Sequence, residues 1–141
     1  MIFDLADMKY DRDLTAKSRL IQRECGEIIC RLNNRGVLLS SITVRELYLM
    51  LDNHLREVIA KRIQYDIEEA KVNMAATSKE IMILRLDQAL NLAYECIVSP
   101  IISHKAIEGL NFNCFSKMVD DIKSDAHRDL IIAIAEIESN Q

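Results

Sequence analysis

The sequence predicts an all-α fold: one domain over residues 1–141, built as a compact bundle of about five helices. Three Gly and one Pro in 141 residues are too few for a fold rich in tight turns, since such turns use the backbone angles of these two residues. Apolar side chains also recur every three or four residues, the spacing of one helix face. With 50% hydrophobic and 28% charged residues, the composition is that of a globular protein.

The N-terminal third of the chain predicts an arm and one helix. Residues 1–10 contain several apolar side chains, and we expect them to form an arm that lies on the core. A helix is expected from about residue 11 to Asn33, because a stripe of apolar residues runs through it. Gly36 then ends it, since glycine adopts the left-handed conformation that closes many helices. The apolar residues 37–39 are expected to be a buried connection. The stripe consists of Leu14, Ile21, Cys25, Ile28 and Leu32.

A long second helix is predicted around residues 43–75. Thr43 and Glu46 have the spacing of a capping box, in which each side chain bonds a free backbone amide at the helix start. At 1.5 Å per residue the helix would be about 50 Å long, whereas a globule of this size is about 37 Å across. The helix is therefore either kinked, with a break near Asp52 and Asn53, or extends beyond the core and needs a partner.

The third and fourth helices are predicted from their starting signals. Thr77 begins a second capping box, so a helix should run from there to about residue 98. Polar residues occupy only one sector of it, and we expect this most apolar helix to be central. Ser99 followed by Pro100 is typical of a helix start, because proline fits the first helical position. A short fourth helix should therefore begin there and end at Gly109.

The last helix is predicted from about Cys114 to Glu138, with Asn113 as its cap. Its apolar stripe stays in phase along the whole segment, which favours one continuous helix. Residues 130–135 are apolar on all sides, although a helix that faces one core needs only one stripe. Ile131, Ile132 and Ile134 are therefore either covered by neighbouring helices or form an interface with another chain. Together with the long second helix, they predict a homo-oligomer.

Charge and cysteine content indicate the compartment. The net charge of −4 argues against nucleic acid or an anionic membrane as partner of the whole domain. No apolar run reaches the ~18–20 residues that span a bilayer, and Asp4 and Asp7 interrupt the N-terminus too early for a secretory signal. No CxxC spacing occurs, so we expect a cytoplasmic protein with reduced, mostly buried thiols rather than a disulfide or zinc site. The four cysteines are Cys25, Cys30, Cys96 and Cys114.

No catalytic constellation emerges from the spacing of reactive residues. His54, His104 and His127 are isolated and follow neither ligand nor triad spacing, whereas acid–base catalysis needs a positioned partner. Asp121 and Asp125 share a helix face, as a hydrolytic metal site might use, but the pattern favours a solvated acidic face. The sequence therefore predicts no enzyme, no cofactor and no metal.

Two groups of basic side chains offer a nucleic-acid alternative. One group shares the face of the first helix opposite its apolar stripe; the other lies within the second helix. The apolar spacing over residues 44–63 partly fits a helix-turn-helix. However, Tyr48 stands where that motif has a small residue, and Asp52 stands where it has the glycine of the turn. The groups are Arg12, Arg19 and Arg23, and Arg56, Lys61 and Arg62.

These observations favour a non-enzymatic helical protein–protein interaction module, an adaptor, inhibitor or accessory factor that self-associates and acts as a regulator. The alternative is a helical nucleic-acid-binding regulator that uses the basic residues of the first or second helix. A third class is a small-molecule binder or enzyme with an interior pocket lined by Tyr48, His54 or Tyr94. The partner is expected to be a protein, without a membrane or cofactor.

Overall fold

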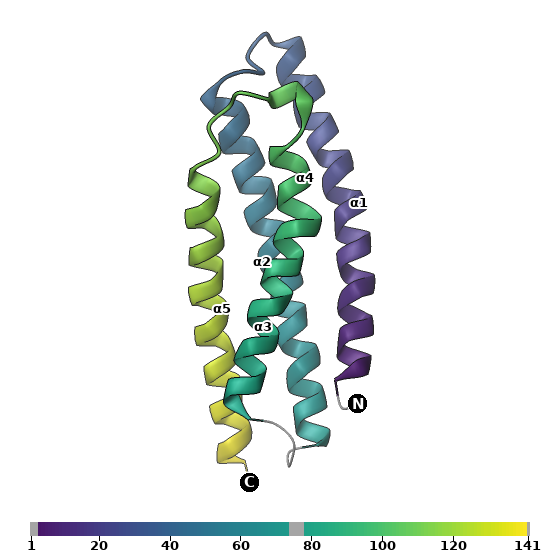
Figure 1. Cartoon of the computed structure of the whole chain (residues 1–141), viewed down its shortest axis with the longest axis vertical. Helices are drawn as coiled ribbons and strands as arrows, with labels where there is room; N and C mark the ends of the chain where they lie inside the picture. Colours follow the sequence, from purple (N-terminus) through teal and green to yellow (C-terminus); the bar gives the residue numbers. More distant parts are fainter. Residues whose placement is uncertain (1–2, 74–77, 141) are drawn as a thin grey trace.

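The computed structural model describes residues 3–73 and 78–140, which form an elongated bundle of four helical rods (Figure 1). The predicted all-α class is confirmed, and the described residues contain no strand. The third rod combines an α-helix, a π-helical turn and a short α-helix. The elements are α1 (Asp4–Asn34), α2 (Ser41–Val72), α3 (Lys79–Ala93), η2 (Tyr94–Val98), α4 (Ser99–Ile102), the 3₁₀ turn η3 (Lys105–Ile107) and α5 (Cys114–Ser139).

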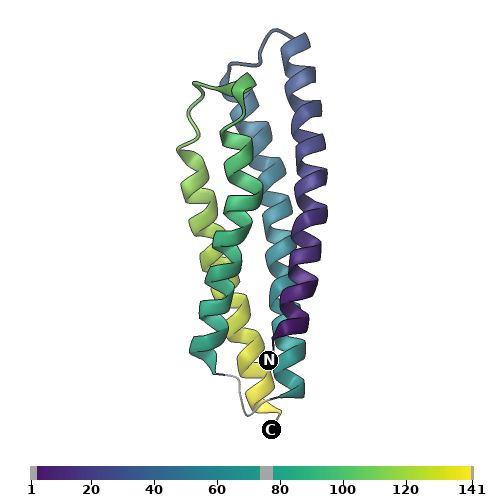
Figure 2. The ribbon, with the colours of Figure 1, turned by 45° about the vertical axis from the view of Figure 1, so that its right-hand side comes forward.

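Helix α2 contacts all three other rods, whereas α1 and α5 lie on opposite sides of the bundle (Figures 1 and 2). Successive rods run in opposite directions along the long axis, so α2 and α5 run parallel to each other. The amino-terminal ends of α2 and α5 therefore lie at the same end of the bundle, next to the connection 103–113.

Helix α1 begins at Asp4, so the predicted N-terminal arm is wrong for the described residues of that segment. Ala6 and Tyr10 are buried and carry the apolar stripe two turns further toward the N-terminus. Asp4 and Asp7 favour a helix start, because carboxylates stabilise the positive end of the helix dipole. In the sequence alone these carboxylates stand out only as interruptions of an apolar segment.

The predicted glycine ending of α1 is confirmed. Gly36 has a φ of 71°, and its N–H donates to the Asn33 carbonyl at 3.0 Å. The N–H of Val37 donates to the Leu32 carbonyl at 3.0 Å. These two bonds make up a Schellman motif, which satisfies carbonyls that the helix end leaves free. Leu39 is 67% exposed, so the connection that follows is only partly buried.

Helix α2 is continuous from Ser41 to Val72, without the break expected near Asp52. The helix does not extend beyond the core either, because α1, with 31 residues, packs along the 32 residues of α2. At 1.5 Å per residue both helices are about 48 Å long. The estimate of a molecule about 37 Å across assumed a sphere, whereas the bundle is elongated.

The predicted capping box at the start of α2 is also wrong. The helix begins two residues before Thr43, whose hydroxyl donates to the Leu38 carbonyl inside the bundle. Glu46 does not return to the helix start, because it pairs with Arg31 of α1. Ser40 is the N-cap residue, but its side chain bonds no amide of the first turn.

The third rod passes through Ser99 instead of breaking there as predicted. Pro100 has no N–H for the carbonyl four residues earlier, and its ring crowds that carbonyl. The chain responds with the π-turn η2, in which the Ser99 N–H reaches back to the Tyr94 carbonyl. The carbonyl of Cys96 instead lies 3.5 Å from the hydroxyl of Ser18 on α1. Ser78 caps the rod's start, whereas Thr77 lies outside the described residues.

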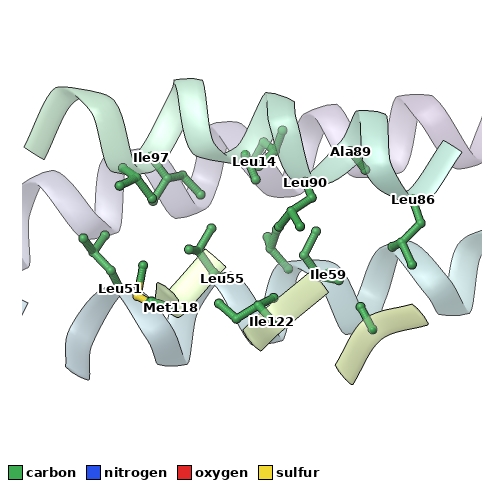
Figure 3. Packing of buried hydrophobic residues seen from close by; sticks show 14 of the residues in the cluster. Leu14, Leu51, Leu55, Ile59, Leu86, Ala89, Leu90, Ile97, Met118 and Ile122 are labelled. Carbon is green, nitrogen blue, oxygen red and sulfur yellow. The ribbon is translucent and has the colours of Figure 1, made fainter. Parts of the chain in front are cut away.

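The core runs along the bundle axis and draws on every rod (Figure 3). Leu51, Leu55 and Ile59 project from successive turns of α2 toward residues of α3, η2 and α5. No helix of the described part is both long and apolar enough to cross a bilayer.

Candidate functional site

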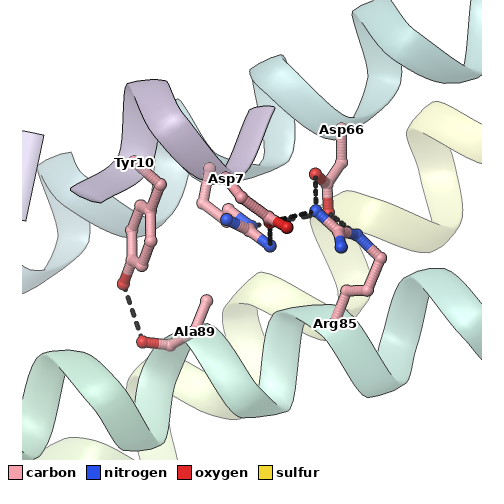
Figure 4. A network of polar contacts seen from close by, with 6 residues as sticks. Asp7, Tyr10, Asp66, Arg85 and Ala89 are labelled. Atoms are coloured by element: carbon pink, nitrogen blue, oxygen red, sulfur yellow. Dashed lines mark hydrogen bonds and ion pairs between the residues drawn. The ribbon is translucent and has the colours of Figure 1, made fainter. Parts of the chain in front are cut away.

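A network of two arginines and two aspartates, most of it buried, joins α1, α2 and α3 (Figure 4). Asp7 accepts hydrogen bonds from Arg62 and from Arg85, both at 2.7 Å. Arg85 also donates to Asp66 at 2.9 and 3.2 Å. The side chain of Asp66 is only 3% exposed, and those of Arg62 and Arg85 are 7% and 14% exposed. Two positive and two negative charges therefore balance, although Asp7 is 47% exposed and the buried Nε of Arg62 has no hydrogen-bond partner among the described residues.

Aromatic rings cover both arginines of this network. The Arg85 guanidinium lies 4.0 Å from the ring centroid of Phe3, and that of Arg62 lies 4.9 Å from the ring of Tyr10. The Tyr10 hydroxyl donates to the Ala89 carbonyl at 2.7 Å (Figure 4). Cation–π contacts of this kind stabilise a guanidinium that has lost its water. The network thus fixes the position of three helices relative to one another.

The electrostatics of the network follow from its partners. Burial opposes ionisation of Asp7, but the hydrogen bonds from Arg85 and Arg62 outweigh burial and hold its pKa below the ordinary value. Burial likewise opposes the charge on Arg85, and the two aspartates nevertheless raise its pKa. Burial raises the pKa of Tyr10, which stays protonated as a donor. Asp7 and Arg85 therefore stay charged and Tyr10 stays neutral near pH 7, which suits a structural role rather than proton transfer.

The histidines belong to contacts within and between helices. His54 of α2 lies 3.0 Å from the Lys17 amine and 2.7 Å from a Glu24 carboxylate oxygen, both on α1. His127 of α5 lies 2.5 Å from Asp87 of α3. His104 accepts from the N–H of Ala106 and caps η3. Within residues 3–73 and 78–140, no group of three or more His, Cys, Asp or Glu side chains could hold a metal ion.

The basic residues predicted on α2 do not share one surface. Arg62 is buried in the network, so it cannot reach a phosphate outside the bundle. Arg56 is held by Asp52 at 3.1 Å and by Asp125 at 2.7 Å, and its guanidinium lowers the pKa of Asp125. Of the three residues, Lys61 alone is exposed. The continuous α2 also has no turn where a helix-turn-helix requires one.

The basic residues predicted on α1 do lie on the surface. Arg12, Arg19 and Arg23 are all exposed. Arg12 is 3.7 Å from Asp13, and Arg19 lines a groove between α1 and the third rod.

The three isoleucines predicted as an interface occupy different environments. Ile134 is 8% exposed and belongs to the core, so it does not face a partner. Ile131 and Ile132 are 40% and 52% exposed, but as neighbours in a helix they point about 100° apart. Ile131 and Ile132 therefore cannot both lie at the centre of one interface.

An exposed apolar stripe on α3 was missed as a surface by sequence reasoning. Ile81, Leu84 and Leu92 are 46%, 57% and 39% exposed, and we call them the α3 apolar face. They lie with Gln88 within an arc of about 80°, while Met82, Leu86 and Leu90 fill the core. The available signal was the width of the apolar sector on this helix, which exceeds what one core contact needs.

The pair formed by Asp87 and His127 brings Ile131 close to this face. It fixes the antiparallel register of α3 against α5. One turn further along α5 lies Ile131, and one turn earlier along α3 lie residues 83 and 84. The α3 apolar face therefore continues onto α5 through Ile131, and Ile132 points away from it.

Two of the grooves on the described surface involve residues that the sequence singled out. One lies between the start of α2 and the start of α5 and encloses about 540 Å³, with Tyr48 and Arg45 on its walls. The other lies between α1 and the third rod, encloses about 480 Å³, and is lined by Glu95 and Arg19 among others. Tyr48 thus meets solvent in a groove, and neither His54 nor Tyr94 lines it, so the predicted shared pocket does not form there.

The cysteines differ from the expectation of mostly buried thiols. All four are free, but only Cys25 is buried, whereas Cys30, Cys96 and Cys114 are exposed. Burial raises the pKa of the Cys25 thiol, which makes this thiol a packing residue.

Comparison with protein-family models, with curated proteins and with solved structures gives no match to this chain.

Proposed function

We propose that this protein is a helical protein–protein interaction module that self-associates through the α3 apolar face. The observation that carries the proposal is the exposure of Ile81, Leu84 and Leu92 on one outward side of α3. Exposed apolar side chains gathered on one side of a helix mark interaction surfaces, because removing them from water lowers the free energy. The inner side of the same helix already fills the core, so folding of the chain alone does not require them.

The spacing of the face suits a second copy of the same chain. Leu84, Gln88 and Leu92 follow one another at intervals of four residues. A two-fold axis through Gln88 would place Leu84 of one copy against Leu92 of the other, and two amides that can bond each other at the centre. Such an isologous contact is the usual form of a homodimer. The spacing favours an antiparallel pair of α3 helices.

The charges around the face are compatible with this pairing. Glu95 is the exposed acidic residue at one end of the outward face. The two-fold arrangement brings it near Ile81 of the second copy at the edge of the contact, where its carboxylate stays in water. No like charges then meet at the centre of the contact. The proposed role is that of an adaptor, inhibitor or accessory factor with a protein partner. Three exposed free thiols support a reducing, cytoplasmic location as part of this proposal.

Replacing Leu84 by Glu tests the proposal by sedimentation equilibrium. The wild-type chain is expected to form a dimer at tens of micromolar. In the L84E variant each copy presents a carboxylate to an apolar side chain, and desolvating an unpaired charge is costly. We expect the dimer dissociation constant to rise by about 100-fold or more, equivalent to about 2.7 kcal/mol.

Ile132→Glu is the matched control, because Ile132 is 52% exposed and Leu84 is 57% exposed. It adds the same charge to the outward side of α5 and is expected to leave the dissociation constant within about twofold, a change below 0.5 kcal/mol. A wild-type chain that sediments as a monomer, or a control variant that dissociates as strongly, would overturn the proposal.

A further inference from the structure

We propose that the groove between α2 and the start of α5 binds a small amphipathic anion, with a carboxylate or sulfonate head and an apolar tail. The groove encloses about 540 Å³, within the range of small-molecule sites in proteins. It lies away from the α3 apolar face, so this site is independent of the proposed self-association.

The walls of the groove are mainly apolar and are held in place by aromatic contacts. Val44, Leu49 and Leu110 line it together with the ring of Tyr48. The Tyr48 ring meets the buried ring of Phe115 edge-on, with centroids 5.9 Å apart. An apolar tail would therefore enter a preformed surface, without the cost of ordering its walls.

The head group is indicated by Arg45, the one charged side chain among the described residues that line the groove. Among the described residues it makes no ion pair and no hydrogen bond. Arg31, Arg56 and Arg62, by contrast, each pair with a carboxylate. An arginine beside an apolar surface favours an anion that brings its own apolar part, because its planar guanidinium binds carboxylates with two hydrogen bonds.

The surroundings also fix the direction in which the anion lies. Neither α2 nor α5 carries an acidic residue in its first turn, and Glu46, which follows Arg45, is paired with Arg31 of α1. At the Tyr48 end, burial and then the carboxylates of Asp52 and Asp121 raise the pKa of the phenol. A second negative group would meet these carboxylates. The head therefore lies at Arg45, with an uncharged tail directed toward Tyr48.

Anilinonaphthalene sulfonate is a suitable probe, since it combines a sulfonate head with an apolar ring system and fluoresces when bound. We expect the wild-type chain to bind it, and Arg45→Gln to weaken binding about tenfold, the loss of one hydrogen-bonded charge. Arg23→Gln is the matched control, because Arg23 is exposed and lines neither groove. It is expected to leave the affinity unchanged. Equal affinity in the wild type and R45Q would overturn the proposal.

The thiol of Cys114 gives a second readout at the site itself, since it is exposed and lines the groove. In a chain with Cys30→Ser and Cys96→Ser, octanoate should slow alkylation of Cys114 severalfold, whereas octanol at the same concentration should not. Unchanged alkylation in saturating octanoate would contradict the assignment. So would a loss of probe binding in Arg19→Gln rather than in Arg45→Gln, because Arg19 lines the other groove.

Discussion

Replacing Asp66 by Ala is expected to lower the free energy of unfolding by about 3–5 kcal/mol, the usual cost of removing one partner from a buried ion pair. The Asp66 side chain is 3% exposed and accepts two hydrogen bonds from Arg85. Without it, Asp7 must compensate two guanidinium groups, and the buried network carries an uncompensated positive charge. Urea unfolding followed by circular dichroism measures the loss. Each comparison needs one fixed protein concentration, because association adds to apparent stability.

Asp125→Ala is the control for this prediction. Asp125 also pairs with an arginine, Arg56, but its side chain is 39% exposed, and exposed pairs contribute about 1 kcal/mol or less. The double variant Asp66→Leu with Arg85→Met should recover much of the loss, because it removes both charges and leaves Asp7 with Arg62. If D66A and D125A lost equal amounts of unfolding free energy, burial of the network would not increase its contribution to stability.

Replacing Leu55 by Ala is expected to lower the free energy of unfolding by about 2–5 kcal/mol, through lost apolar contact and the cavity that remains. Leu55 is fully buried at the middle of α2, among residues such as Met118 and Ile122 of α5 (Figure 3). Three other rods surround this level of the helix, so the site cannot collapse without moving several elements. The same urea titration measures the change.

Leu49→Ala is the matched control on the same helix, since Leu49 is 52% exposed. We expect the free energy of unfolding to change by about 0.5 kcal/mol or less, as for most surface substitutions. If L49A lost as much unfolding free energy as L55A, the placement of these two turns of α2 relative to the core would be contradicted.

Periodicity was sufficient for the fold class, but the ends of the helices required tertiary information. The first two turns of α1 carry Asp4 and Asp7, which look like interruptions in the sequence, although Asp7 pairs with Arg62 and Arg85 of two other helices. Thr43 and Glu46 have capping-box spacing, yet each bonds a residue outside its own helix. Local spacing cannot distinguish a cap from a contact with a neighbouring helix, because both use the same side-chain atoms.

The surfaces were harder to predict than the helices. Arg62 looked like part of a basic surface cluster, because its partner Asp7 is distant in sequence. Ile134 looked like a surplus apolar residue, although it is buried in the core. The α3 apolar face was hidden for the opposite reason. A helix with apolar residues on most sides was expected to be central, whereas a bundle of four rods leaves every helix one outward side.

Disulfide cross-linking of Gln88→Cys tests the central claim, self-association through α3, most directly. A two-fold axis through residue 88 brings the two new thiols together, and a disulfide forms when the Cα atoms are about 4.4–6.8 Å apart. In a chain with Ser in place of the exposed Cys30, Cys96 and Cys114, mild oxidation should yield a covalent dimer of Q88C and leave Ile132→Cys monomeric. A monomeric Q88C chain, or equal cross-linking of both variants, would contradict an interface centred on this face.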